Sequence, residues 1–107
     1  MTTFDKREES FEKKFALDEE LRFKAAARRN KLLGLWVAEK LGKTGAEAEA
    51  YAKTVVAADL AQPGEEDVYV KVKADLDQAN AGQSEHQIRR TMDELMAKAV
   101  QQIRSEA

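Results

Sequence analysis

Apolar side chains recur at helical intervals in four stretches of this chain, and short glycine-containing runs separate the stretches. The separating runs are Gly42–Gly45, Gln62–Gly64 and Asn80–Gln83. The stretch after the last run has the most regular pattern, because its apolar residues form one stripe and charged residues cover the remaining surface. That stripe consists of Ile88, Met92, Leu95, Met96, Ala99 and Ile103. The pattern predicts an all-α chain with four helices.

Residues that suit helix starts follow the separating runs or lie within them. Thr44 with Glu47, and Ser84 with Gln87, have the spacing of a capping box. The acidic run at 65–67 suits the positive end of a helix that begins after the proline-containing separator. These signals place the starts of the second, third and fourth helices.

The stretch from Val68 to Lys73 is ambiguous, because apolar and polar residues alternate in it as they do in a strand. A helix also fits, with one face formed by Val68, Val72, Leu76 and Ala79. A lone strand would have no partner strand in this chain, and an isolated strand is not stable. We therefore predict a helix.

Residues from about Asp18 to Leu41 form the longest helical stretch, and it is apolar on two sides. One face carries Leu21, Ala25, Leu32, Leu35 and Trp36, and the nearly opposite face carries Phe23, Leu33, Val37 and Leu41. Such a helix is expected at the centre of a bundle, in contact with the other three. The second stretch has an alanine-rich face that lets a neighbouring helix approach closely, formed by Ala48, Tyr51, Ala52, Val55 and Ala58. We predict a four-helix bundle of residues 18–107.

Residues 1–17 precede this bundle and carry a different pattern. Phe4, Phe11 and Phe15 would form one narrow stripe on a helix over residues 3–16, among densely mixed acidic and basic side chains. Burying three phenylalanines contributes at most ~5–9 kcal/mol, whereas ordering about fifteen residues costs roughly 15 kcal/mol or more. The segment therefore needs a surface on which to fold.

Two surfaces are compatible with the pattern of residues 1–17. Either the phenylalanines pack on the bundle as an extension of the first helix, or they form a recognition helix that orders in a partner's groove. Pattern alone leaves both alternatives open. The four helices already supply a full set of core residues, which favours the recognition helix.

Charge and composition narrow the classes of function. Charged residues make up 36% of the 107 residues, yet the net charge is −2 because both signs are mixed along the chain. A nucleic-acid-binding protein usually has a segregated basic surface, and we interpret the short basic run Arg28–Lys31 as a solvated helix face. The absence of cysteine excludes disulfides and Cys-based zinc sites. The sequence has no apolar run typical of a transmembrane helix or a signal peptide, so we expect a cytoplasmic protein.

Catalytic and metal-binding constellations are missing, and we predict a protein that is not an enzyme and has no cofactor. Gly42–Thr44 looks like the end of a phosphate-binding loop, but Val37 stands where that motif requires a glycine, and a helix precedes it. His86 has no second histidine to complete a metal site. Asp75 and Asp77 point in different directions on a helix and make a poor acid–base pair.

Several runs of the sequence resemble a known family. They are Phe23–Trp36 (FKAAARRNKLLGLW), His86–Glu94 (HQIRRTMDE), Phe11-Glu12 with Lys14-Phe15-Ala16, and Asp18-Glu19-Glu20. These runs are similar to the zeta subunit family, the inhibitor proteins of the alphaproteobacterial F-type ATP synthase. The resemblance covers almost the whole chain at similar length.

The resemblance implies a four-helix protein whose mobile N-terminal segment enters the catalytic sector of the synthase. There the segment would lodge between catalytic and non-catalytic subunits near the rotor and block rotation in the hydrolysis direction. The bound protein would be peripheral, on the cytoplasmic face of the inner membrane. Carried onto this chain, the partner-binding residues of the inhibitory segment would be Phe4, Asp5, Lys6, Arg7, Glu8, Phe11, Glu12, Lys14 and Phe15.

Three positions depart from the family pattern, in which we expect an acid at position 6, asparagine at 13 and histidine at 17. This chain has Lys6, Lys13 and Leu17 there. The departures leave open a second function, in which a protein of the same fold docks on the synthase or senses nucleotide with weak inhibition or none. The resemblance also implies weak nucleotide binding on the bundle for some members, but no motif here locates such a site.

Overall fold

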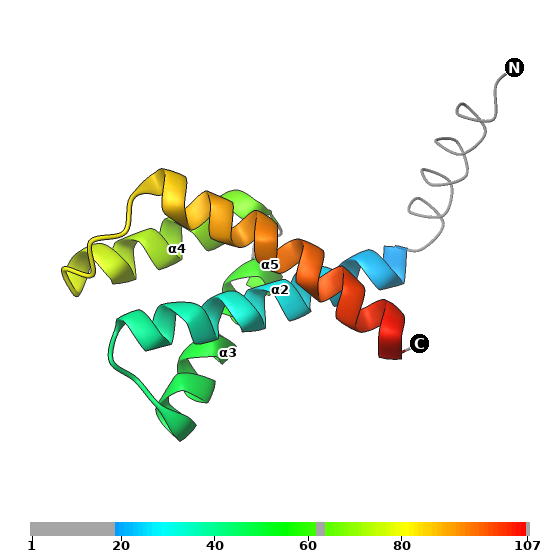
Figure 1. Cartoon of the computed structure of the whole chain (residues 1–107), viewed down its shortest axis with the longest axis horizontal. Helices are drawn as coiled ribbons and strands as arrows, with labels where there is room; N and C mark the ends of the chain where they lie inside the picture. Colours follow the sequence, from blue (N-terminus) through cyan, green and yellow to red (C-terminus); the bar gives the residue numbers. More distant parts are fainter. Residues whose placement is uncertain (1–18, 62–63, 107) are drawn as a thin grey trace, which may run out of the picture.

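The computed structural model of the protein describes residues 19–61 and 64–106, and this part of the chain forms four helices (Figure 1). They are α2 (Glu19–Lys40), α3 (Gly45–Ala61), α4 (Glu65–Gln78) and α5 (Glu85–Glu106). The described residues contain no strand, and the alternating stretch from Val68 is helical within α4. The prediction of an all-α, four-helix bundle is confirmed. The segment predicted at residues 1–17 lies outside the described residues.

The glycine-containing run after α2 ends this helix, as predicted. Gly42 has a φ of 77°, and its backbone N–H donates to the carbonyl oxygen of Glu39 at 3.1 Å. The N–H of Lys43 donates to the carbonyl oxygen of Ala38 at 2.9 Å. These two bonds form a Schellman motif, in which a residue with positive φ closes the helix. Gly42–Thr44 is therefore a helix end that leads into a helix start, and not a phosphate-binding loop.

The two predicted capping boxes have different outcomes. At α5, the N–H of Gln87 donates to Ser84 Oγ at 3.1 Å, and the N–H of Ser84 donates to Gln87 Oε1 at 2.9 Å. At α3, the N–H of Glu47 donates to the backbone oxygen of Thr44 at 3.2 Å, so the box predicted there is wrong. The reason is Gly45, whose φ of 55° interrupts the helical backbone directly after Thr44.

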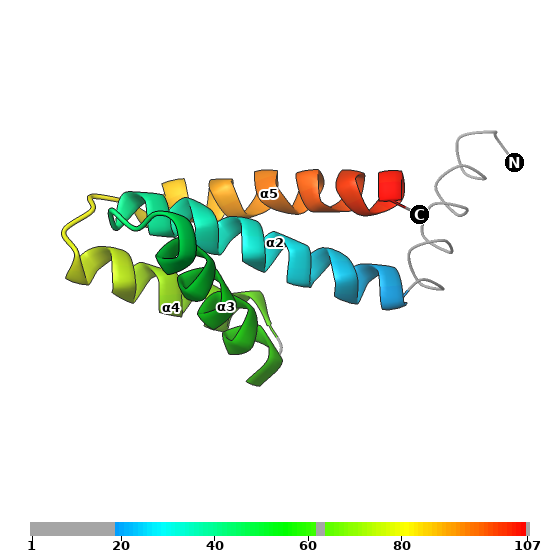
Figure 2. The ribbon, with the colours of Figure 1, turned by 90° about the horizontal axis from the view of Figure 1, so that it is seen from below.

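The core lies between the four helices, and α2 contacts each of the other three. Figure 2 shows α2 between α5 on one side and α3 and α4 on the other. The largest core side chains are at most 1% exposed, and they are Leu33, Val37, Val55, Val68, Val72, Leu76, Ile88 and Met92. The predicted central position of α2 is confirmed. Ala79, predicted on the buried face of α4, is exposed because it caps the end of that helix.

Helices α2 and α3 approach each other closely at Gly34. A Cβ atom on Gly34 would lie 2.5 Å from the Cα of Ala52 and 3.3 Å from Cγ2 of Val55. Both distances are shorter than ordinary van der Waals contact, so position 34 has no space for a side chain. The absence of a Cβ on α2 and the small side chain on α3 bring the two backbones together, as the alanine-rich pattern predicts.

The interpretation of Arg28–Lys31 as a solvated helix face is wrong for its two central residues. Arg29 is 4% exposed and Asn30 is 0% exposed, because α2 is covered by helices on more than one side. The Nε–H of Arg29 donates to Asn30 Oδ1 at 2.8 Å, and its Nη1 pairs with Glu65 Oε1 at 3.3 Å. The buried cation thereby gains the partners that burial requires, and it joins the middle of α2 to the first residue of α4.

Helices α2 and α5 are longer than the other two. Each has 22 residues, whereas α3 has 17 and α4 has 14. At 1.5 Å per residue, α2 and α5 are about 33 Å long and α4 about 21 Å. The beginning of α2 and the end of α5 therefore extend together beyond α4 (Figure 2). Phe23, predicted on an apolar face with Leu33 and Val37, is 61% exposed because it lies in this extension.

Candidate functional site

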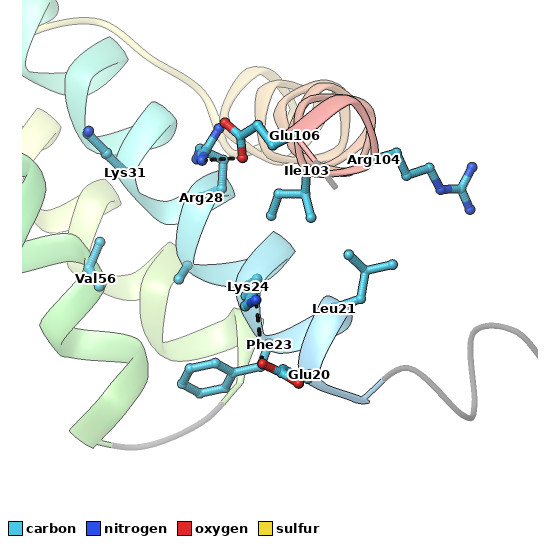
Figure 3. A pocket seen from close by; sticks show the side chains of 11 residues that line it. Glu20, Leu21, Phe23, Lys24, Arg28, Lys31, Val56, Ile103, Arg104 and Glu106 are labelled. Atoms are coloured by element: carbon cyan, nitrogen blue, oxygen red, sulfur yellow. Dashed lines mark hydrogen bonds and ion pairs between the residues drawn. The ribbon is translucent and has the colours of Figure 1, made fainter.

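A groove of about 930 Å³ lies where the beginning of α2 and the end of α5 extend beyond the rest of the bundle (Figure 3). Its walls come from residues 20–31 of α2 and 103–106 of α5, and Val56 of α3 completes it. The uncovered length of these two helices explains the groove, because among the other described helices α4 contributes no lining residue and α3 contributes Val56 alone. Three helices that are distant in sequence therefore contribute to one surface.

The apolar part of the groove is formed by five side chains. They are Leu21, Phe23 and Ala27 of α2, Val56 of α3 and Ile103 of α5. Leu21 and Ile103 lie on opposite sides of the groove (Figure 3). Phe23 is one of the two large apolar side chains that are strongly exposed among the described residues, the other being Val70 of α4. An exposed phenylalanine beside other apolar side chains marks a surface suited to binding another protein segment.

Basic side chains form most of the charged rim of the groove. Arg28 crosses from α2 to α5, where its guanidinium donates to Gln102 Oε1 at 2.8 Å and to Glu106 Oε2 at 2.9 Å. Lys24 pairs with Glu20 at 3.4 Å, but both side chains are mostly exposed, so this ion pair is weak. Lys31 also lines the groove, and within the described residues it forms no ion pair. The rim therefore favours a segment with acidic side chains.

A second polar cluster joins α3 to α4 outside the groove. The hydroxyl of Tyr51 donates to Asp75 Oδ2 at 2.6 Å, and Lys71 Nζ pairs with the same oxygen at 3.0 Å. Burial raises the pKa of Tyr51, and the hydrogen bond and negative charge of Asp75 raise it further. A phenol that binds its proton more tightly than free tyrosine is a poor general base near neutral pH. We assign this cluster a structural role.

The other candidates for chemistry stay apart in the structure. His86 is exposed in the first turn of α5, as predicted. Asp75 has the partners given above, whereas Asp77 pairs with Lys73 at 2.6 Å, so the two carboxylates face different neighbours. No group of three or more histidine, aspartate or glutamate residues in the described ranges could hold a metal ion.

Comparison with known proteins identifies the family of this chain. The family described as ATPase inhibitor subunit zeta matches residues 1–102. This chain belongs to the zeta family. This chain is also similar to a protein whose structure was solved by solution NMR, with 52% sequence identity and a TM-score of 0.71. The comparison covers 81% of this chain and 99% of that one. No curated protein matches.

The predicted partner-binding residues of this zeta-family chain all precede the described residues. The residues concerned are Phe4, Asp5, Lys6, Arg7, Glu8, Phe11, Glu12, Lys14 and Phe15, and their roles stay predictions. The described chain starts at Glu19, and Glu20 and Leu21 already line the groove. The groove and the predicted segment are therefore neighbours along the chain. None of the described helices combines the length and apolar character that a membrane span needs.

The groove of this zeta-family chain is not apparent from the sequence pattern. The pattern places Arg28 on a solvated face, whereas its side chain connects α2 to α5. It places Phe23 on an apolar face with Leu33 and Val37, whereas Phe23 is exposed. A signal for the groove was present in the unequal lengths of the four predicted stretches. Two long helices packed with two short ones must leave part of their length uncovered, and Phe23 falls in that part.

Proposed function

We propose that this chain is a regulatory inhibitor subunit that binds the catalytic sector of the F-type ATP synthase and blocks ATP hydrolysis. The observation that carries the proposal is the match to the ATPase inhibitor family over residues 1–102. That match begins in the charged, phenylalanine-containing segment and continues through the bundle. A family of inhibitor subunits is regulatory in character, and this supports a regulatory role for the chain.

We further propose that residues 1–16 carry the inhibition. Phe4, Phe11 and Phe15 act as apolar anchors on one face of a helix. Charged contacts flank them and come from Asp5, Lys6, Arg7, Glu8, Glu12 and Lys14. What supports this assignment is the pattern of the segment itself, in which the three phenylalanines fall on one face of a helix among charged side chains.

The mechanism follows from the shape of such a segment. A helix that lodges between a catalytic and a non-catalytic subunit near the rotor adds a solid element to an interface that must change shape in every catalytic cycle. On this proposal the segment inserts and the bundle, whose principal-axis extents are 54, 27 and 24 Å, remains at the enzyme surface. On this proposal the protein is peripheral, on the cytoplasmic face of the membrane.

A titration of ATP hydrolysis tests the proposal. The assay uses the purified catalytic sector of the synthase without its own inhibitor, and it compares the full-length chain with a chain that lacks residues 1–16. We expect inhibition by the full-length chain alone. Circular dichroism and cooperative unfolding of the shortened chain check that the four helices remain folded. Equal inhibition by both chains would show that the inhibitory site lies elsewhere.

Point variants locate the site more sharply. We expect the double variant Phe11→Ala/Phe15→Ala to raise the half-inhibitory concentration by at least ~30-fold, since anchor residues at protein interfaces contribute about 2 kcal/mol or more. The matched control is Val70→Ala, which truncates another exposed apolar side chain, one that is 56% exposed on α4 and outside the groove. A similar loss in both variants would refute the specific role of the phenylalanines.

A second candidate is a protein of the same fold that docks on the synthase or senses nucleotide without strong inhibition. The observation that favours it is the presence of Lys6, Lys13 and Leu17 where the family pattern has other residues. Binding to the catalytic sector with unchanged hydrolysis would support this candidate. Restored inhibition after Lys6→Glu, Lys13→Asn and Leu17→His would then trace the difference to these three positions.

A further inference from the structure

An apolar strip flanked by lysines runs from the groove onto α3. Phe23 and Ala27 of α2 and Val56 of α3 form the strip, and Phe23 is 61% exposed. A smaller hollow of about 310 Å³ between α2 and α3 shares Lys31 and Val56 with the groove, so the two form one continuous surface. We call this surface the α2–α3 face, and its residues are Phe23, Lys24, Ala27, Lys31, Lys53 and Val56.

The positive charge of the α2–α3 face is left largely unpaired within the described ranges. Lys31 and Lys53 are exposed and form no ion pair there, and Lys24 has only its weak, exposed pair with Glu20 at 3.4 Å. Glu49 lines the smaller hollow but pairs with neither lysine. Because the whole chain has a net charge of −2, this basic face is a local feature that the overall charge does not explain.

We propose that the α2–α3 face docks an acidic amphipathic helix on the surface of the catalytic sector, as a contact separate from that of the inhibitory segment. The inference rests on the proposed function, because it concerns the inhibitor in its bound state. Apolar side chains of the docked helix pack on Phe23 and Val56, and its carboxylates pair with Lys31 and Lys53. A helix held in a groove in this way binds through its apolar stripe, and the flanking charges select its sequence.

The dimensions of the face fit a short helix. Residues 20–31 line the groove along α2, a length of about 17 Å at 1.5 Å per residue. A helix of about three turns covers this length and brings one apolar side chain per turn to the strip. Lys24 and Lys31 are seven residues apart, so they lie on the same side of α2, two turns from each other. Acids with the same two-turn spacing are therefore expected on the docked helix.

Connectivity explains why the partner surface belongs to the catalytic sector. The proposed inhibitory segment ends at residue 16, and α2 begins at Glu19. Three residues span at most about 11 Å in any backbone conformation. When the segment occupies its interface, the start of α2 is therefore held at the enzyme surface. Phe23 lies one turn farther along α2, so the α2–α3 face begins where the bundle meets the enzyme.

A second contact changes the kinetics of inhibition in a characteristic way. Once the segment has bound, the face is held close to its partner helix, so its contacts form within the complex and slow dissociation. Loss of the apolar anchor Phe23 should therefore act mainly on the dissociation rate. Reversal of a flanking charge such as Lys31 should act mainly on the association rate and its dependence on salt.

Zero-length crosslinking of the complex tests the contact directly. The full-length chain is bound to the purified catalytic sector without its own inhibitor and treated with a carbodiimide, which joins a lysine to a carboxylate in contact with it. We expect Lys31 and Lys53 to be linked to acidic residues of one subunit helix, identified by mass spectrometry. Lys98 is the control, because it is an exposed lysine of α5 that does not line the face. Absence of links from Lys31 and Lys53, equal linking of Lys98, or links only to a second copy of this chain would overturn the inference.

Matched variants test the contribution of the face to inhibition. We expect Phe23→Ala to raise the half-inhibitory concentration by at least ~5-fold through faster dissociation, whereas Val70→Ala, the other strongly exposed apolar side chain, has little effect. Lys31→Glu should raise it by about fivefold at low ionic strength and by less at high salt, whereas Lys98→Glu changes it little. Urea unfolding checks that each variant keeps the stability of the original chain. Equal effects within either pair would overturn the inference.

The two proposals fail in different ways. If the full-length chain inhibits hydrolysis and the Phe23 and Lys31 variants inhibit equally well, the docking surface is wrong and the proposed function stands. If the chain binds the catalytic sector without inhibiting it, the proposed function is wrong, and the crosslinks of Lys31 and Lys53 still decide whether the face is in contact. A chain that does not bind the catalytic sector would overturn both.

Discussion

Substitution of Gly34 by alanine tests the closest contact in the bundle. The new Cβ would lie 2.5 Å from the Cα of Ala52, a backbone atom that cannot move without its helix. Overpacking of this kind costs about 1–3 kcal/mol, and a backbone clash belongs at the upper end. Alanine is about 1 kcal/mol better than glycine inside a helix, which offsets part of the cost. We expect Gly34→Ala to lower the free energy of unfolding by about 2 kcal/mol.

Urea unfolding followed by circular dichroism measures this change, and thermal unfolding should show a midpoint lower by about 8–16 °C. Ala74→Gly, at an exposed position of α4, measures the helix-propensity contribution separately. The double variant Gly34→Ala/Ala52→Gly should not recover full stability, because the clash with the Cα at position 52 remains. A Gly34→Ala protein as stable as the original, or more stable, would refute the close approach of α2 and α3.

Two further predictions compare matched pairs of variants by urea unfolding. Glu65→Ala should lower the free energy of unfolding by about 1–3 kcal/mol, because it leaves the buried guanidinium of Arg29 without its carboxylate partner. Glu66→Ala, which breaks an exposed ion pair, should lower it by less than about 1 kcal/mol. Equal effects of the two substitutions would contradict the role of Arg29. Ser84→Ala should lower the free energy of unfolding by about 1 kcal/mol, because it removes the hydrogen bond that caps α5. Thr44→Ala should change it by no more than about 0.5 kcal/mol. A larger loss at Thr44 would contradict the structure at the start of α3.

The buried residues of a helix could be predicted from the sequence wherever the helix has a single buried face. The stripe predicted for α5 faces the bundle, since Ile88, Met92, Ala99 and Ile103 are buried, and its other two members, Leu95 and Met96, are half-buried. The ambiguous stretch of α4 was also resolved correctly, by the argument that a single strand has no partner. Periodicity works in these helices because each has one buried face and one solvated face.

The same reasoning failed along α2, where several faces are covered to different depths. Arg29 and Asn30 are buried although their residue types suggest solvent, and Phe23 is exposed although its type suggests the core. Burial at these positions depends on where the neighbouring helices end, which is a property of the whole bundle. A local pattern records which side of a helix a residue occupies, but it does not record how far along the helix the neighbours reach.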